Sequence, residues 1–155
     1  MHDQLLLQLI EDDIPAAGQL LELLQAESVA LHGRDMALME NILAQKQALI
    51  VLLDQHGRRR TQLLQELGLN ADRDGLQQLA EHTNLGAQLL AGGDALSALL
   101  AECQSANAHN GQSILRQQMA TANQIRILTG GDAPSLYDSR GSTARMSKPR
   151  ALSQA

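Results

Sequence analysis

Apolar residues recur every three or four positions over most of the chain, which predicts helices rather than strands. The first such segment runs from Gln4 to Leu31. Pro15 interrupts it, and a proline either starts a helix in its first turn or kinks one that runs through. We expect one long helix bent near Pro15, with a turn at residues 32–34.

A second helix is predicted between Asp35, a good N-cap, and Gly68, a residue suited to the left-handed position after a helix. Its buried seam in steps of three and four residues is Met39, Ile42, Lys46, Leu49, Leu53, His56, Arg60, Leu63 and Leu67. Successive helical residues fan out by about 100°. The triplet at residues 58–60 therefore predicts a solvated face with one inward salt bridge rather than a nucleic-acid patch.

Residues 70–93 are less regular. Asn70 or Asp72 can cap a short helix, and a second short helical piece follows it. Gly92-Gly93 predicts the end of that piece, because glycine is unfavourable in helix interiors.

Asp94 is then the predicted cap of a last long helix, which runs to Leu128 and stops at Gly130-Gly131. One apolar seam runs along it, and a second stripe occupies its C-terminal half. The second stripe consists of Leu115, Met119, Ala122 and Ile125.

The predicted fold is all-α. Short turns between long helices favour antiparallel packing, so we expect an elongated antiparallel bundle of three long helices with a short helical insert over residues 1–129. Residues 130–155 are rich in Ser, Gly, Pro and Arg and hold few large apolar residues. They predict a flexible, disordered basic tail.

The composition limits which partners and which cellular location we expect for the chain. The chain has thirty leucines and a single aromatic residue, Tyr137 in the tail, with no Phe and no Trp. Its net charge is −5, and most of the acidic side chains lie in the predicted helical part. We therefore expect no nucleic-acid partner. No 18-residue run is wholly apolar, so we expect no membrane insertion. The first residues lack a secretion signal, and the single cysteine, Cys103, fits a reducing cytoplasm.

Candidate chemistry is sparse. The five histidines show no metal-ligand spacing, and Cys103 lies on an apolar stripe, which favours a buried structural thiol over a nucleophile. We therefore expect no catalytic site, no metal and no cofactor, and hence no enzyme.

One interior segment of the last helix is unusual. Asn107 and Asn110 lie three residues apart on one face, and Gly111 follows. Asparagine in a helical seam costs stability but can fix register. We interpret the segment mainly as a packing and register device with close helix approach at Gly111; a polar notch that receives a partner is the alternative.

The order of these features resembles the flagellar export chaperones of the FlgN family. The resemblance covers most of residues 1–141. It is carried by Arg34-Asp35 opening the second helix, Lys46 within it, Arg60 with Leu63-Leu64 and Leu67-Gly68-Leu69 closing it, Asn107-x-x-Asn110-Gly111, Leu128-Thr129-Gly130, and Tyr137-Asp138-x-x-Gly141 in the tail.

The resemblance implies a cytosolic, non-enzymatic chaperone that holds the C-terminal helical segments of the hook-associated proteins, which join hook and filament. It would prevent their premature assembly and deliver them to the export gate and ATPase complex. On this interpretation, the stripe of Leu115, Met119, Ala122 and Ile125 contacts the client. Tyr137, Asp138 and Gly141 form a docking point for the export apparatus.

The alternative is a structural coiled-coil or adaptor subunit that homo-oligomerises through its apolar stripe. A homodimer in the absence of client also stays open.

Overall fold

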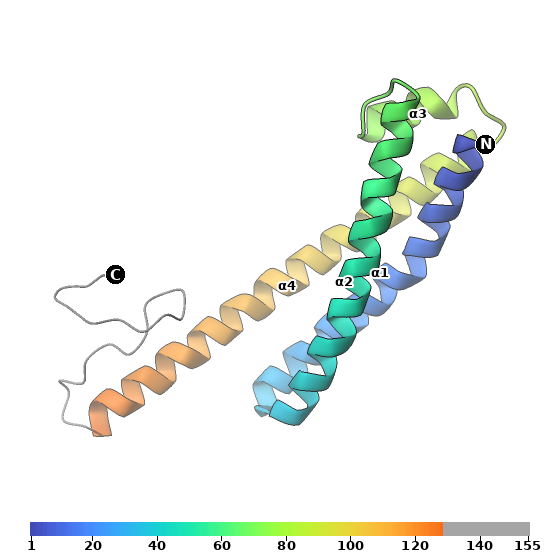
Figure 1. The fold of residues 1–155 in the computed structure, drawn as a ribbon. Helices are drawn as coiled ribbons and strands as arrows, with labels where there is room; N and C mark the ends of the chain where they lie inside the picture. Colours follow the sequence, from blue (N-terminus) through green and yellow to red (C-terminus); the bar gives the residue numbers. More distant parts are fainter. Residues whose placement is uncertain (129–155) are drawn as a thin grey trace. The chain divides into compact units, whose positions relative to one another are not determined.

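The computed structural model describes residues 1–128, apart from the side chains of Thr121, Asn123, Gln124, Ile125, Ile127 and Leu128. Within this range the protein is all-α, as predicted (Figure 1). Three helices are long and one is short. They are α1 (His2–Gly33), α2 (Met36–Glu66), α3 (Arg73–Ala80) and α4 (Gly86–Leu128). By its internal contacts the chain forms two units, Met1–Ser113 and Ile114–Ala155.

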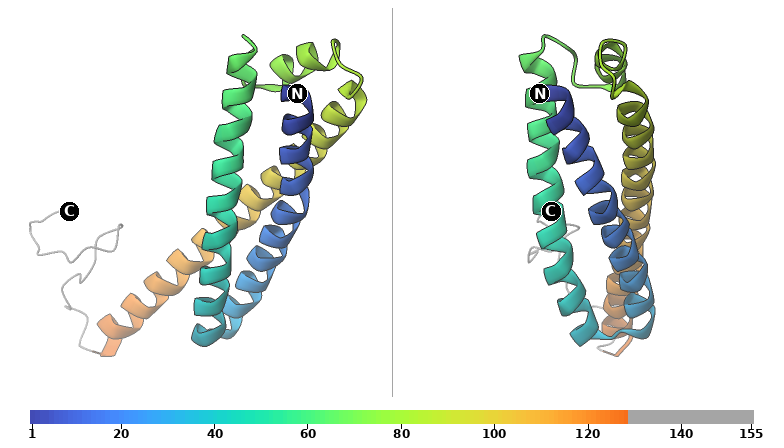
Figure 2. Two further views of the ribbon diagram at one scale, coloured as in Figure 1. Left: turned by 45° about the vertical axis from the view of Figure 1, so that its right-hand side comes forward. Right: turned by 90° about the vertical axis from the view of Figure 1, so that its right-hand side faces the viewer.

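Helix α1 is the central element of the first unit. It buries twelve of its 32 residues, whereas α2 buries four of 31. Figure 2 shows α1 between α2 and the first part of α4, with α1 and α2 running in opposite directions. Most of the buried residues form one large cluster and one smaller one. The large cluster joins leucines of α1, α2 and α4, and the smaller one joins Leu20, Leu24 and Cys103.

Pro15 lies inside α1, so the prediction of one continuous helix is confirmed. An interior proline costs about 3 kcal/mol because it removes a hydrogen bond and crowds the preceding turn. Pro15 is on the exposed side, while Asp13, Ala16 and Ala17 beside it are buried. Packing of α1 on both sides of Pro15 therefore outweighs the local cost.

The link between α1 and α2 is short. Arg34 takes a left-handed conformation, with φ 53°, and its N–H donates to the end of α1. Asp35 then caps α2 by accepting a hydrogen bond from the Leu38 N–H at 3.1 Å. At the other end Gly68 has φ 74° and Leu69 N–H donates to Leu64 O. Both predicted boundaries of α2 are confirmed.

The predicted seam of α2 faces the protein. Its members from Met39 to Leu63 are all at least partly buried. Leu67 is the exception, because it lies beyond the last turn as the C-terminal cap and is exposed. The prediction for Leu67 is wrong.

The predicted helix end at Gly92-Gly93 is also wrong, because α4 runs through both residues. A Cβ on Gly92 would lie 2.9 Å from Ile10 Cγ2, and one on Gly93 would lie 2.8 Å from Leu76 Cδ2. The glycines thus allow α4 to approach α1 and α3 closely. Asp94 is not a cap; its carboxylate accepts hydrogen bonds from Arg73 of α3.

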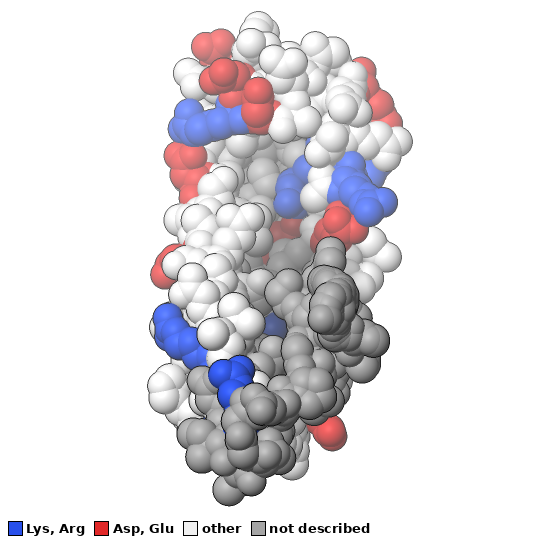
Figure 3. Space-filling model, turned by 90° about the vertical axis from the view of Figure 1, so that its left-hand side faces the viewer, with Lys and Arg blue, Asp and Glu red and all other residues white. Residues whose placement is uncertain are grey.

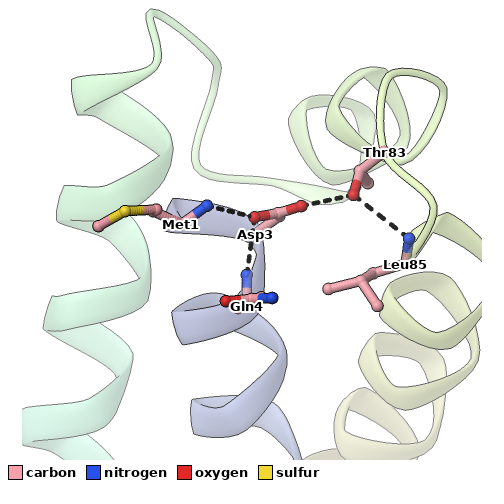
Figure 4. A network of polar contacts seen from close by, with 5 residues as sticks. All are labelled: Met1, Asp3, Gln4, Thr83 and Leu85. Atoms are coloured by element: carbon pink, nitrogen blue, oxygen red, sulfur yellow. Dashed lines mark hydrogen bonds and ion pairs between the residues drawn. The ribbon is translucent and has the colours of Figure 1, made fainter.

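The short helix predicted after Asn70 or Asp72 is confirmed as α3, and Asp72 is its cap. A polar network closes this end of the unit (Figure 4). Asp3 accepts hydrogen bonds from the N-terminal ammonium of Met1 at 2.8 Å and from the Thr83 hydroxyl at 2.5 Å. These donors, together with the Gln4 N–H, hold the pKa of Asp3 well below its usual range. The network ties the start of α1 to the loop before α4.

Length and composition alone would allow α2 to cross a membrane, with a mean hydropathy of 1.3 over its most apolar window. The sequence-based expectation that no segment is apolar enough to span a membrane therefore does not hold for α2 by this measure. One helix of this kind is weak support for a membrane span. Lys46 on this helix is buried in an ion pair with Glu27, which belongs to a folded interior rather than to lipid.

Alanine at three glycines of α4 tests the close approach. Alanine gains about 1 kcal/mol of helix propensity over glycine, whereas overpacking costs about 1–3 kcal/mol. Gly92→Ala should lower the free energy of unfolding by about 1 kcal/mol, because the Ile10 methyl it meets is attached at a rigid β-branch. Gly93→Ala should be near neutral, since the Leu76 methyl can rotate away.

Gly111→Ala is the matched control, because a Cβ there would meet no atom within 4 Å. It should raise the free energy of unfolding by about 0.5–1 kcal/mol. Urea unfolding followed by circular dichroism gives all three values. Equal stabilisation by all three substitutions would contradict the close packing of Gly92.

Candidate binding surfaces

The second stripe of α4 is exposed where the structure describes it. Leu115 and Met119 are 49% and 59% exposed, and Ala122 is also exposed. The side chain of Ile125 lies outside the described part. All four residues belong to the unit that begins at Ile114. Large apolar side chains on a helix surface offer area that a second amphipathic helix could cover.

Asn110 lies in the interior of the first unit, with 2% of its surface exposed. Its side-chain amide donates to Leu24 O and to Glu27 Oε1, both at 2.8 Å. Lys46 of α2 donates to both oxygens of the same Glu27, at 3.0 and 2.9 Å. One carboxylate on α1 therefore joins α2 and α4.

The neighbours of Asn110 behave differently. Asn107 is exposed. Gly111 is exposed too, and open space surrounds the position of its missing Cβ. The predicted close helix approach at Gly111 is wrong. Asn110 faces the interior, and Gly111, the next residue along the helix, faces solvent. Gly92 and Gly93 have that close-approach role instead.

A second buried carboxylate lies nearer the start of α1. Asp13 is fully buried and accepts hydrogen bonds from His56 Nδ1 at 2.6 Å and from the Arg60 guanidinium. The predicted inward salt bridge of the arginine triplet is therefore confirmed at Arg60. Arg58 is exposed and pairs with Asp54 one turn away.

The sequence did not predict a groove between α2 and α4, with a volume of about 690 Å³. Its floor is Leu6 and Ile10 of α1, and its walls include Leu53 of α2 and Leu96 and Leu100 of α4. Figure 3 shows a hollow on this face of the molecule, with basic and acidic side chains along its edges.

Small residues form part of the lining of this groove. Gly57 of α2 and Gly93 and Ser97 of α4 line it. The sequence offers the small residues as a signal, but their role depends on which helices face each other. Gly57 reads locally as a weak point of a helix, and Gly93 reads as a helix stop.

The described residues offer little for catalysis. Cys103 is buried and its Sγ lies 3.5 Å from Ala17 O, as expected for a structural thiol. Burial, with a smaller contribution from the nearby Glu102 charge, raises the pKa of this thiol. Over residues 1–128 no group of three or more metal-ligating side chains comes together. Tyr137, Asp138 and Gly141 lie outside the described residues.

The sequence model of the FlgN protein family matches residues 1–145. This chain belongs to the FlgN family. A crystal structure of a protein from Pseudomonas aeruginosa that bears the name flagella synthesis protein FlgN is 41% identical in sequence. The match covers 79% of this chain and 94% of that one, with a TM-score of 0.68. No curated protein matches the chain.

Family membership gives a general role. FlgN proteins are soluble flagellar chaperones rather than an enzyme family, and the role of this chain is in flagellar export and flagellum biogenesis. Buried ion pairs hold the helices of the first unit, and the groove and the stripe each expose apolar surface to which a partner could bind.

Removing a buried carboxylate tests the polar ties. Asp13→Ala leaves the Arg60 guanidinium and His56 without their partner, and breaking a buried ion pair in this way costs about 3–5 kcal/mol. Arg58→Ala is the control, because it removes an exposed pair worth at most about 1 kcal/mol. Urea unfolding should separate the two variants clearly. A loss below about 1 kcal/mol for Asp13→Ala would contradict its structural role.

Proposed function

We propose that this chain is a cytoplasmic chaperone for the hook-associated proteins of the flagellum. It binds their C-terminal helical segments, keeps them from assembling early and delivers them to the export apparatus. Membership of the FlgN family supports the general role. The exposed apolar stripe of Leu115 and Met119 is the observation that supports helix binding.

The stripe has the chemistry that an amphipathic helix needs. Leu115, Met119 and Ala122 follow one another at intervals of four and three residues, so they share a face of α4. Methionine adapts its shape to different partners because its side chain is unbranched and flexible. Covering Leu115 and Met119 would remove apolar area from water, worth about 1.5–3 kcal/mol for each side chain fully buried.

The groove between α2 and α4 is a second candidate surface for a client. Its floor is apolar, its walls combine leucines with polar residues such as Thr61 and Gln65, and its edges hold the Arg73–Asp94 and Arg58–Asp54 ion pairs. A helix laid in it would contact α1, α2 and α4 together, as a fourth helix does in a four-helix bundle. Variants that block one surface at a time decide between stripe and groove.

Delivery to the export gate and ATPase complex is proposed for the tail. Tyr137 is the single aromatic residue of the chain. An aromatic side chain flanked by Leu136 and Asp138 can supply a compact anchor in a binding pocket. Gly141 completes the motif that the family resemblance assigns to docking.

Two acidic substitutions test the stripe. Leu115→Asp with Met119→Asp should weaken binding of a purified hook-associated protein at least about a hundredfold by titration calorimetry, because two charges would have to be desolvated against apolar partners. Helical circular dichroism should stay unchanged. Ala120→Asp puts a single charge on another face of the same helix and should keep affinity within about threefold.

Ser97→Arg is the complementary variant. Ser97 is exposed within the groove, so a long side chain there fills the groove without removing a core residue. If Ser97→Arg abolishes binding while the double variant binds normally, the groove is the client site and the stripe is not. If neither variant changes the affinity for the client, the proposal that the client binds to the stripe or to the groove is wrong.

Tyr137→Ala tests delivery separately from holding. Client affinity in the calorimeter should equal that of the unchanged chain, because Tyr137 is proposed to contact the export apparatus instead. Export of hook-associated proteins into the medium should fall at least about tenfold. Tyr137→Phe keeps the ring and should retain most export. Normal export with Tyr137→Ala would refute the docking role.

A further inference from the structure

The groove between α2 and α4 contains a charged side chain that the fold engages only in part. Arg60 of α2 lines the groove, and its side chain is 19% exposed. Its Nη1 donates to the fully buried carboxylate of Asp13 on α1. A guanidinium carries several N–H donors in a flat fork, so the edge formed by Nε and Nη2 still has donors to offer. Among the described residues, Asp13 is the acceptor bonded to Arg60, and it takes Nη1.

Gly57 keeps this edge of Arg60 reachable from the groove. It lies about one helical turn before Arg60 and lines the same groove. Side chains on a helix lean over the preceding turn, so the guanidinium of Arg60 extends past residue 57. A Cβ on Gly57 would lie 3.5 Å from Arg60 Nη2. Because Gly57 has no side chain, its own position leaves Nη2 uncovered.

The other charged side chains that line the groove have partners within the fold. Its aspartates are engaged in the ion pairs at the edges and in the cap of α3. Arg58 and Arg73 of these ion pairs are 81% and 56% exposed, so water reaches their remaining donors. Arg60 differs, because a partner that covers the groove removes water from its open edge. That partner must supply an acceptor, since a buried donor without one is costly.

The lining of the groove also sets what kind of segment fits it. Its floor and long walls are helices, which bond their backbone groups internally and offer no strand edge to an extended peptide. An amphipathic helix brings its own backbone hydrogen bonds, and its apolar side chains match the floor of Leu6 and Ile10. A carboxylate on the same face matches Arg60, because two parallel hydrogen bonds can join it to the Nε–Nη2 edge.

We propose that the groove binds a client helix that carries one carboxylate within its apolar face, and that Arg60 selects this carboxylate. The inference rests on the proposed chaperone function and concerns the groove alone, whether or not the stripe also contacts the client. A helix with a wholly apolar face would cover Arg60 without giving it an acceptor, and would therefore bind less tightly. Arg60 thus makes the groove selective among amphipathic helices.

Arg60→Lys in the full chain tests this anchor. A lysine ammonium keeps the positive charge beside Asp13 but has no second flat edge for a client carboxylate. Affinity for the C-terminal segment of a purified hook-associated protein should fall at least about tenfold by titration calorimetry, with helical circular dichroism unchanged. Arg59→Lys is the matched control, because Arg59 pairs with Glu66 and is not part of the groove lining. It should keep affinity within about twofold.

Substitutions in the client segment identify the carboxylate, and they need no change in this chain. Each Asp of the segment is changed to Asn, and each Glu to Gln, one at a time. One of these changes should weaken binding to the unchanged chain at least about tenfold, yet have little further effect on Arg60→Lys, because both remove the same contact.

The outcomes separate this inference from the proposed function. If the client segment binds but none of its carboxylates matters, the carboxylate anchor is wrong and the chaperone role stands. Full affinity with Arg60→Lys, or with Ser97→Arg in the groove, has the same meaning. If the unchanged chain binds no client segment, the proposed function and this inference both fail.

Discussion

Two buried carboxylates on one helix hold the first unit together. Asp13 and Glu27 lie fourteen positions apart on α1, about 21 Å along its axis. Asp13 binds His56 and Arg60 of α2, and Glu27 binds Lys46 of α2 and Asn110 of α4. A leucine surface alone would let neighbouring helices slide by a turn at little cost, whereas a buried charge without its partner is expensive. These contacts therefore set the register of both outer helices.

Local sequence could predict the ends and the buried face of α2, but not the residues of other helices that this face contacts. The ends of α2 follow from Asp35 and Gly68, whose chemistry acts within a few residues. The seam of α2, including its three polar members, follows from helical spacing. Its partners on α1 do not, because nothing in the spacing tells which carboxylate a buried lysine meets. Asn110 was predicted as a register device, but only the fold shows Glu27 beside it.

The errors arise where tertiary packing overrides local preference. Gly92-Gly93 resembles a helix end in the sequence, yet both residues lie inside α4, where Ile10 and Leu76 pack close to the positions that side chains would occupy. Gly111, which was expected to allow close approach, points into open space. The groove was missed for the same reason: its walls come from helices whose facing sides are set only once α1 is in place. The shared apolar face of Leu115, Met119 and Ala122 could be predicted, because it depends on one helix alone.

The buried thiol has a practical consequence. Cys103 is the single cysteine of the chain, and its sulfur faces Ala17 O across the contact between α1 and α4. Burial disfavours the reactive thiolate, so a thiol reagent can label this residue only when the two helices separate. The labelling rate therefore reports how often the α1–α4 contact opens, and no further cysteine has to be introduced. Measured with and without a bound client, that rate would show whether binding stiffens the unit or loosens it.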